Sequence, residues 1–190
     1  MRDDLGTSSA EVHAKAREVL GFWFSLTPEQ HFAKSDTIDR EIRRRFGPLR
    51  DAVLKNGAAG WRDDPDSLLA AILLLDQFSR NIHRDSAEAF AGDALAQELT
   101  LLALKRGWDA DMPDERKQFL YMPLMHAEDK ALQHLCLEKF QPLGDYLMGF
   151  ARDHADVIAR FGRFPTRNEA LGRASTAEEK AYLSQPDVGW

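Results

Sequence analysis

Apolar residues recur every three or four positions along most of the chain, and no stretch alternates as a strand does. This spacing predicts a first helix from about Glu11 to Ser25. Thr27 followed by Pro28 is typical of a helix start, because Thr caps helix N-termini and Pro suits the first helical position. Ser35 predicts the N-cap of a long helix that ends at Asn56-Gly57. We therefore expect a chain built from helices.

The middle of the chain holds its most apolar stretch. Pro48 lies inside the preceding helix and predicts a kink or a division there. Asp66 or Ser67 is then expected to begin an unusually apolar helix, Leu68 to Phe78. Apolar residues on every side of a helix indicate burial, so we interpret this helix as the central one of the core.

Proline, glycine and capping residues divide the second half of the chain into further helices. The signals are the cap Ser86 with a helix from about Ala87 to Arg106, the start Pro113, the interruption Pro123, the start Pro142 of a helix to about Phe161, and the capping-box pattern Ser175-Thr176-Ala177-Glu178. Seven or eight helices with short connections result.

The pattern as a whole predicts one all-α domain. We expect residues 1–10 to be a flexible N-terminus and residues 11–190 to form the domain. Successive antiparallel helices of this length suit hairpins stacked into an α-solenoid, and a compact bundle is the alternative.

Composition and charge narrow the classes of partner. The chain has 190 residues, which suits one domain, and a formal net charge of −6. That charge disfavours a general nucleic-acid binder and a protein held by charge to an anionic membrane. Residues 1–11 do not resemble a signal peptide, and no apolar run approaches the roughly 20 residues of a membrane span. We expect a cytoplasmic protein.

Polar residues collect at four places where helix packing does not require them, and the first is 76–84. Asp76 and Arg80 stand four positions apart and share a helix face, so they can form an ion pair. Either this is a helix end made soluble, with Arg80 near the negative pole of the helix dipole, or Asp76 orients Arg80 towards a ligand. The amide of Asn81 belongs to the same candidate site.

The second place is 121–130, where His126 and Asp129 are followed by Gln133 at helical spacing. Three interpretations stay open: a histidine that stabilises the bend expected at Pro123, a histidine oriented by a carboxylate for ligand binding or proton transfer, and part of a metal site. A single His-x-x-Asp pair supplies only two metal ligands. We expect no bound metal or other cofactor.

The third place is 153–160, near the end of the long helix. His154 borders the apolar stripe of that helix and is either a core histidine or a functional one. Asp156 and Arg160 are again four positions apart, so an ion pair is expected between them.

The fourth place is 160–168, where three arginines and an asparagine lie among aromatic residues just after the long helix. Gly162 suits the left-handed residue that ends a helix, and the proline that follows prevents the helix from resuming. Arg163 and Arg167 either bond to helix-terminal carbonyls or hold an anion between their guanidinium groups, with Asn168 beside them.

These places carry a resemblance to a known family. The segments Val19–Phe24, Leu75–Asn81, Tyr121–Asp129, Phe161–Asn168 and Leu171–Thr176 together resemble the bacterial family known as domain of unknown function 924. The resemblance covers nearly the whole chain and implies an all-α fold like that of tetratricopeptide-repeat (TPR) proteins, with paired helices in a right-handed superhelix. It implies no established activity.

The chain departs from the family's usual pattern at two positions. Thr166 stands where the family usually has His, and Ser79 where it usually has Pro. A Thr hydroxyl can donate or accept a hydrogen bond but does not titrate near neutrality. Catalysis by a histidine in the 160–168 segment is therefore not expected.

The polar places lead to three hypotheses of function. The first is a pocket for a small anionic ligand, the second a TPR-like module that binds a protein or peptide, and the third a metal-dependent hydrolase that uses His126, Asp129 and His154. The structural alternative is an internal salt-bridge network in which Asp76, Asp129 and Asp156 face the arginines. No nucleic-acid or membrane partner is expected, and the oligomeric state is left open. The residues expected to bind the ligand are Asp76, Arg80, Asn81, His126, Asp129, Arg163, Arg167 and Asn168, with His126 and His154 as candidates for catalysis.

Overall fold

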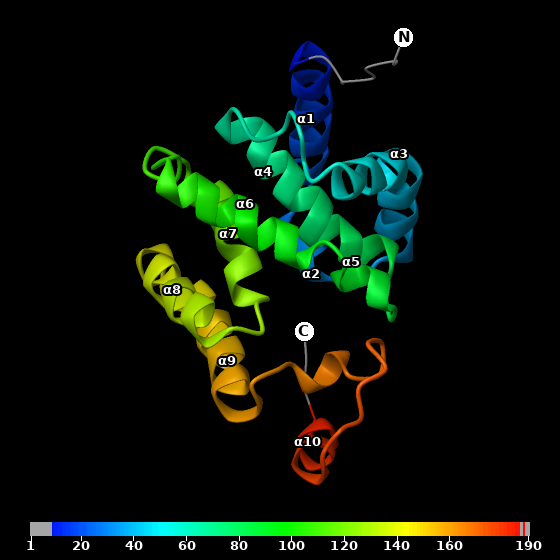
Figure 1. Ribbon diagram of the computed structural model, residues 1–190, viewed down its shortest axis with the longest axis vertical. Coiled ribbons are helices and arrows are strands. Elements are labelled where there is room, and N and C mark those ends of the chain that lie inside the picture. The colour runs from blue at the N-terminus through cyan, green and yellow to red at the C-terminus, as the bar shows by residue number, and fades with distance from the viewer. Residues whose placement is uncertain (1–8, 187, 189–190) are drawn as a thin grey trace.

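The computed structural model describes residues 9–186 and 188, and within them every regular element is helical (Figure 1). The all-α prediction is confirmed. The α-helices are α1 (Ser9–Trp23), α2 (Pro28–Phe32), α3 (Asp36–Lys55), α4 (Pro65–Leu73), α5 (Ser79–Ile82), α6 (Asp93–Lys105), α7 (Asp114–Met125), α8 (Lys130–Phe140), α9 (Asp145–Phe161) and α10 (Ala177–Leu183). A π-helical turn, Leu74–Phe78, joins α4 to α5, and 3₁₀ turns lie at Ala87–Phe90, Gln141–Leu143 and Pro165–Arg167.

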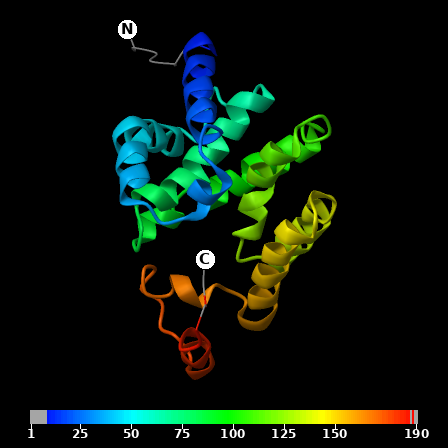
Figure 2. The same cartoon turned by 180° about the vertical axis from the view of Figure 1, so that it is seen from behind.

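Capping side chains set two early helix starts as predicted. Thr27 forms a capping box with Gln30 at the start of α2. Ser35 accepts a hydrogen bond from the N–H of Ile38 at the start of α3. α3 runs through Pro48 without a break, and Figures 1 and 2 show it as two arms at an angle, in agreement with the predicted kink.

Two other starts lie earlier in the chain than predicted. α1 begins two residues early, inside the segment expected to be flexible, and residues 1–8 of that segment lie outside the described residues. α4 begins at Pro65 and not after Asp66 or Ser67. The reason is that Oδ1 of Asp64 accepts hydrogen bonds from the N–H groups of Asp66 and Ser67, which makes Asp64 the N-cap.

Prolines in the second half do not divide the helices as predicted. α7 continues through Pro123 and ends two residues later, at Met125. Pro142 lies in a 3₁₀ turn, and α9 begins only after Gly144, whose φ of 98° is a conformation that favours glycine.

Two further boundaries differ by local backbone geometry. The helix expected at 87–106 is divided into a 3₁₀ turn and α6, and α6 begins at Asp93 directly after Gly92. The last capping box is formed by Thr176 with Glu179, one residue later than predicted.

The core is built around α4. All residues from Leu68 to Leu75 are fully buried, which confirms the interpretation of this helix as central. α1, α6 and α7 pack against α4, and α3 packs against the π turn and α5 (Figure 2). Phe78 lies at the end of this column, and its ring meets those of Phe22, Trp23 and Phe46 at centroid distances of 5.1 to 6.1 Å.

The last third of the chain packs in sequence, α7 against α8 and α8 against α9. The segment after α9 then lies at the opposite end of the molecule from α1 in both ribbon views. It has a small apolar cluster of its own, in which Phe164 packs with Val157 and Ile158 of α9. Stacking of the helix pairs into a TPR-like superhelix, and the extent of a single domain, stay predictions.

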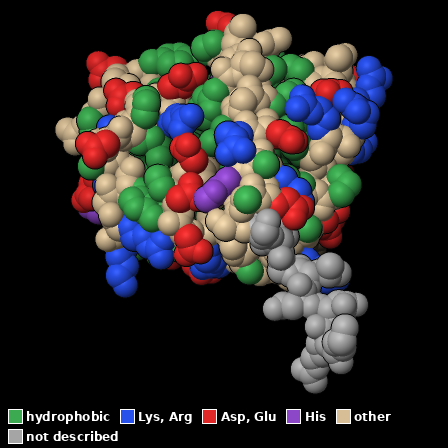
Figure 3. Space-filling model, turned by 90° about the horizontal axis from the view of Figure 1, so that it is seen from above, with side chains coloured by type: hydrophobic (Ala, Val, Ile, Leu, Met, Phe, Trp, Pro, Cys, Tyr) green, Lys and Arg blue, Asp and Glu red, His purple; other side chains and the backbone are tan. Residues whose placement is uncertain are grey.

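Two surface properties bear on the expected partners. In the described ranges, 9–186 and 188, no helix combines the length and the apolar character that a membrane span requires. Figure 3 shows Lys and Arg side chains interspersed with Asp and Glu on the face seen from above. That face therefore presents no extended patch of one sign.

Phe78→Ala is expected to lower the free energy of unfolding by about 3–5 kcal/mol, because removing a fully buried ring leaves a cavity among three other rings. Tyr146 is 78% exposed, so Tyr146→Ala should change the same quantity by less than about 0.5 kcal/mol. Urea denaturation followed by circular dichroism measures both variants. Equal losses of unfolding free energy in the two variants would contradict the placement of Phe78 in the core.

Candidate functional site

A buried carboxylate lies at the centre of the polar cluster. Asp76 is 1% exposed and lies in the π turn between α4 and α5. Its Oδ1 is 2.7 Å from Nδ1 of His126 and 3.0 Å from Nη1 of Arg80. Its Oδ2 accepts a hydrogen bond of 2.7 Å from Nε2 of Gln77. A charge buried this deeply requires such partners, because removing an unpaired carboxylate from water is very costly.

The ion pair predicted between Asp76 and Arg80 is confirmed. Burial by itself would raise the pKa of Asp76. The positive charge of Arg80, together with His126, outweighs burial and holds the pKa of this carboxyl well below its usual range. Asp76 is therefore ionised at neutral pH, and its oxygens act only as acceptors.

Asp93, the first residue of α6, is the second acid of the cluster. Its two oxygens accept hydrogen bonds of 3.1 Å each from the two Nη atoms of Arg80, a bidentate pair. Its Oδ2 also accepts a hydrogen bond of 3.0 Å from Nη1 of Arg167. The sequence did not single out Asp93, because it falls inside the helix predicted at 87–106. The division of that helix places it at a helix start, facing the arginines.

His126 follows α7 and presents one ring nitrogen to Asp76. Because ionised Asp76 can only accept, Nδ1 of His126 carries the proton and donates it. Nε2 of the neutral ring then has a lone pair, and no described residue donates a hydrogen bond to it. Burial lowers the pKa of His126; Asp76 opposes this effect, and Arg80 and Arg167 reinforce it. The ring is therefore neutral at pH 7.

His154 reaches the same place from α9. Its Nδ1 donates a hydrogen bond of 2.7 Å to the carbonyl oxygen of Phe150, and its ring centroid is 5.9 Å from that of His126. Burial, with a smaller contribution from His126, lowers the pKa of His154 to about 3. The two histidines singled out from separate segments thus lie together, and both are neutral at pH 7.

Arg167 reaches the cluster from the segment after α9. Besides its bond to Asp93, its Nη2 donates a hydrogen bond of 2.9 Å to the carbonyl oxygen of His126. Its guanidinium carbon lies 4.7 Å from the ring centroid of Phe90 and 4.6 Å from that of Phe164. Burial, followed by Arg80, lowers the pKa of this guanidinium to about 10. The cation is thus less stable here than in water, and a further negative charge beside it would be stabilised.

We call Asp76, Arg80, Asp93, His126 and Arg167 the dyad site, after the Asp76–His126 pair. Three of its side chains remain partly open to solvent: 22% of Arg80, 15% of His126 and 12% of Arg167. Solvent therefore reaches part of each of these three side chains. The predicted residues that the structure brings together here are Asp76, Arg80, His126, His154 and Arg167.

Two other residues expected to bind the ligand lie elsewhere. Asn81 donates a hydrogen bond of 2.8 Å to Asp39 of α3. Asp129 is exposed and caps α8, where its Oδ1 accepts hydrogen bonds from the N–H groups of Ala131 and Leu132. Both side chains therefore bind partners outside the cluster around Asp76.

Arg163 and Asn168 belong to a second network, which we call the C-terminal brace. Arg163 donates to both carboxylate oxygens of Glu179 at 2.7 and 2.9 Å, and Asn168 donates to the same carboxylate at 3.3 Å. Arg173 completes the brace through two hydrogen bonds, of 2.6 and 2.9 Å, to Glu128. These contacts tie the segment after α9 to α10 and to the connection before α8.

The salt-bridge network expected from the sequence is only partly right. Asp76 pairs with an arginine, but Asp129 is a helix cap, and Arg160 donates to Glu178 at 2.8 Å and not to Asp156. Asp156 is exposed, and Glu178 reaches Arg160 from α10. The acids that pair with the arginines of the two networks are Asp76, Asp93, Glu128 and Glu179.

The described residues do not form the metal site of the hydrolase hypothesis. Among residues 9–186 and 188, no three His, Cys, Asp or Glu side chains are grouped closely enough to hold a metal ion. The rings of His126 and His154 lie close together, but the carboxylate of Asp129 accepts hydrogen bonds from the backbone at the start of α8.

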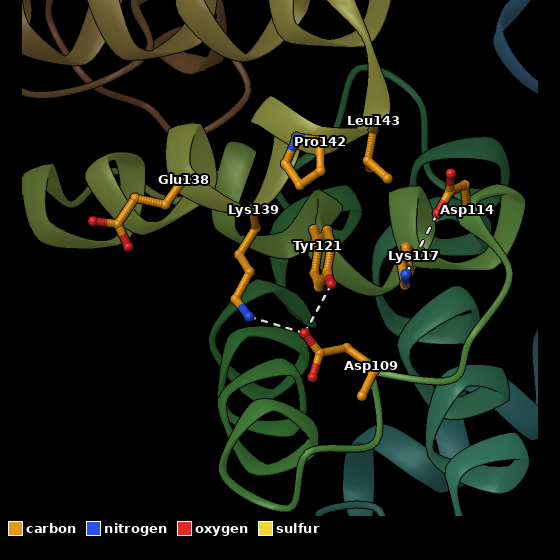
Figure 4. Close-up of a pocket in the computed structure, with 9 residues that line it drawn as sticks. Asp109, Asp114, Lys117, Tyr121, Glu138, Lys139, Pro142 and Leu143 are labelled. Atoms are coloured by element: carbon orange, nitrogen blue, oxygen red, sulfur yellow. Dashed lines mark hydrogen bonds and ion pairs between the residues drawn. The ribbon is translucent and has the colours of Figure 1, made fainter.

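A separate cavity of about 370 Å³ lies between the connection after α6, α7 and the end of α8 (Figure 4). Tyr121 and Lys139 both donate to Oδ2 of Asp109, at 2.8 and 2.9 Å, and Lys117 pairs with Asp114. The sequence did not reveal this cavity, because its charged residues come from separate segments.

Comparisons with known proteins agree with the resemblance seen in the sequence. The family model described as "Bacterial protein of unknown function (DUF924)" matches residues 19–187. The chain is also similar to the solved structure of a protein of unknown function, ATU0120, from Agrobacterium tumefaciens. The TM-score is 0.87, the sequences are 38% identical, and the match covers 91% of this chain and 98% of that chain. Among curated proteins, none matches the chain.

Acidification below pH 6.5 is expected to destabilise the fold through His154. Its pKa is lowered by burial from the usual 6.5 to about 3, so between these values the unfolded chain binds a proton that the folded chain does not. The stabilisation is complete above pH 6.5 and falls by about 1.4 kcal/mol per pH unit as the pH is lowered towards 3. His154→Gln should flatten this part of the curve of unfolding free energy against pH.

The matched control for this prediction is His134→Gln, because the His134 side chain is 78% exposed. Urea denaturation at half-unit intervals from pH 4 to pH 8 gives the curve for each protein. A His154→Gln curve as steep as that of the wild type would contradict the assignment.

Proposed function

The chain belongs to the DUF924 family of bacterial proteins of unknown function, and we propose that its dyad site binds a small ligand through an anionic group. Arg167, together with Arg80, binds a carboxylate or phosphate of the ligand. Nε2 of His126 accepts a hydrogen bond from a hydroxyl or N–H group of the same molecule. The ligand class is thus a small acid that carries a hydrogen-bond donor near its anionic group.

The fixed orientation of His126 is the observation that carries the proposal. The buried carboxylate of Asp76 binds Nδ1–H of His126 at 2.7 Å, and this leaves Nε2 as the acceptor. A carboxylate that holds one nitrogen of a histidine is the usual way to orient the other nitrogen for a ligand or for proton transfer.

The two arginines of the site support an anion as the ligand. Arg80 and Arg167 both bind Asp93, and Arg80 also pairs with Asp76. Burial lowers the pKa of Arg167 to about 10, so a further negative charge beside its guanidinium would be stabilised. Of the residues predicted to bind the ligand, the proposed site keeps Asp76, Arg80, His126 and Arg167, and it adds Asp93.

Peptide binding on α9 is the second candidate function. Tyr146 is 78% exposed and Phe150 is 39% exposed, and their rings meet edge to face at 5.2 Å. An exposed aromatic pair on one helix face suits a protein- or peptide-binding module of the TPR-like kind. The dyad site ranks first, because it combines an oriented acceptor with partly open cationic groups.

Inorganic phosphate at pH 7 is expected to raise the melting temperature of the wild type in a saturable way, beyond the effect of chloride at equal ionic strength. Arg167→Gln should weaken the apparent phosphate affinity at least tenfold, because a charged hydrogen bond contributes about 1.5–3 kcal/mol. Thermal-shift titrations, fitted for each protein against its own melting temperature without phosphate, separate affinity from stability.

Arg44→Gln is the matched control, since the Arg44 side chain is 71% exposed and pairs with Glu41 of its own helix. It should keep the affinity of the wild type. An equal loss in both variants would show that phosphate acts by general screening. The absence of a saturable shift in the wild type, with phosphate and with citrate, would reject the proposed function.

A further inference from the structure

Gly92 lies where the start of α6 touches the π turn. A Cβ atom added to Gly92 would be 2.5 Å from the backbone carbonyl oxygen of Leu75, and 3.1 Å from both Cα and Cβ of Leu75. Real side chains do not approach a backbone oxygen this closely. The two backbones therefore meet directly, and only a residue without a side chain fits between them.

The requirement at Gly92 is for space and not for an unusual backbone conformation. Its φ of −87° and ψ of −9° are accessible to any residue. Gly57, Gly107 and Gly162 show the opposite case, because each has a positive φ, and a Cβ added to any of them would meet no other atom within 4 Å.

This contact joins the two segments that supply the carboxylates of the dyad site. Leu75 directly precedes Asp76, and Gly92 directly precedes Asp93. Both acids bind Arg80, Asp76 from the π turn and Asp93 from the start of α6. The separation of the two carboxylates is thus set by the approach of Gly92 to Leu75.

We propose that Gly92 is a positioning residue of the dyad site: the absence of a side chain lets α6 place Asp93 beside Asp76, so that Arg80 and Arg167 are held for the ligand. The ligand-binding part of this inference rests on the proposed function of the site. The geometric part, that Gly92 sets the Asp93–arginine contacts, stands independently of any ligand.

The distances show why a small displacement matters. Relief of the clash requires the Cβ–oxygen distance to open from 2.5 to at least 3.0 Å, a movement of about 0.5 Å. The hydrogen bonds from Arg80 to Asp93 are already 3.1 Å long, and that from Arg167 is 3.0 Å. Each is near the long end of the range for charged hydrogen bonds, so this movement breaks or bends them.

Gly92→Ala is expected to weaken phosphate affinity at least tenfold in the thermal-shift titration, whereas Gly149→Ala should leave it unchanged. Gly149 is the matched control, because it lies within α9 and a Cβ there meets no other atom within 4 Å. A Gly92→Ala protein that binds phosphate like the wild type would overturn the inference.

A double-mutant cycle distinguishes positioning from a general loss of stability. If Gly92 acts through Asp93, then Gly92→Ala combined with Asp93→Asn should bind phosphate no more weakly than the weaker single variant. Affinity losses that multiply would show that the two residues act separately, and this would reject the positioning role.

A second readout keeps the inference separate from the proposed function. Bidentate pairing slows rotation of the Arg80 guanidinium, so its Nη–H groups should give resolved signals in ¹H–¹⁵N spectra at low temperature. We expect Gly92→Ala to lose these signals and Gly149→Ala to keep them. If the wild type binds no phosphate, the proposed function fails, and these spectra still decide the geometric role.

Asp93→Glu covers the case in which Gly92→Ala does not fold. It changes the reach of the carboxylate by one methylene without adding an atom at the Leu75 contact. If the spacing set by Gly92 is critical, Asp93→Glu should also lose the Arg80 signals and weaken phosphate affinity about tenfold. Retention of both would contradict the inference.

Discussion

The buried carboxylate of Asp76 is the constraint on which the dyad site depends. An ionised group at 1% exposure is tolerated only with charged or hydrogen-bonding partners around it. Those partners are Arg80 from α5, His126 from the end of α7 and the neighbouring Gln77. Because Arg80 and His126 come from other elements, the need to compensate one charge ties the π turn to α5 and to the end of α7. The orientation of His126 is a consequence of that arrangement.

The charge of Asp76 also bears on how the segment after α9 is attached to α6 and α7. Arg80 is shared between Asp76 and Asp93, and Asp93 in turn binds Arg167 from that segment. The apolar contacts of this segment are with α9, through Phe164, whereas its contacts with α6 and α7 are ionic or polar. Arg167 thus joins this segment to α6 and to the end of α7 by hydrogen bonds and an ion pair, while apolar packing joins the segment to α9.

The helices and four of the five residues of the dyad site could be predicted from the sequence, whereas Asp93 could not. Helical periodicity is local, so the buried helix and the Asp76–Arg80 pair could be predicted from spacing alone. The π turn, the division of helix 87–106 and the role of Asp93 depend on how two backbones meet in space, at Gly92 and Leu75. No pattern within one segment carries that information, just as none shows that Asp129 is used as a cap.

The two positions expected to depart from the family's usual residues, Thr166 and Ser79, lie in different surroundings. Thr166 is exposed, and the histidines of the cluster come from α7 and α9, so the missing His leaves the dyad intact. Ser79 is fully buried beside the π turn. Its hydroxyl donates to the carbonyl of Leu74 at 3.2 Å and accepts a hydrogen bond of 2.9 Å from Nε of Arg50. A proline side chain can do neither. In this chain a hydroxyl and a buried arginine therefore hold the turn that carries Asp76. The residue at position 79 thus affects how the dyad site is supported and not the groups proposed to bind a ligand.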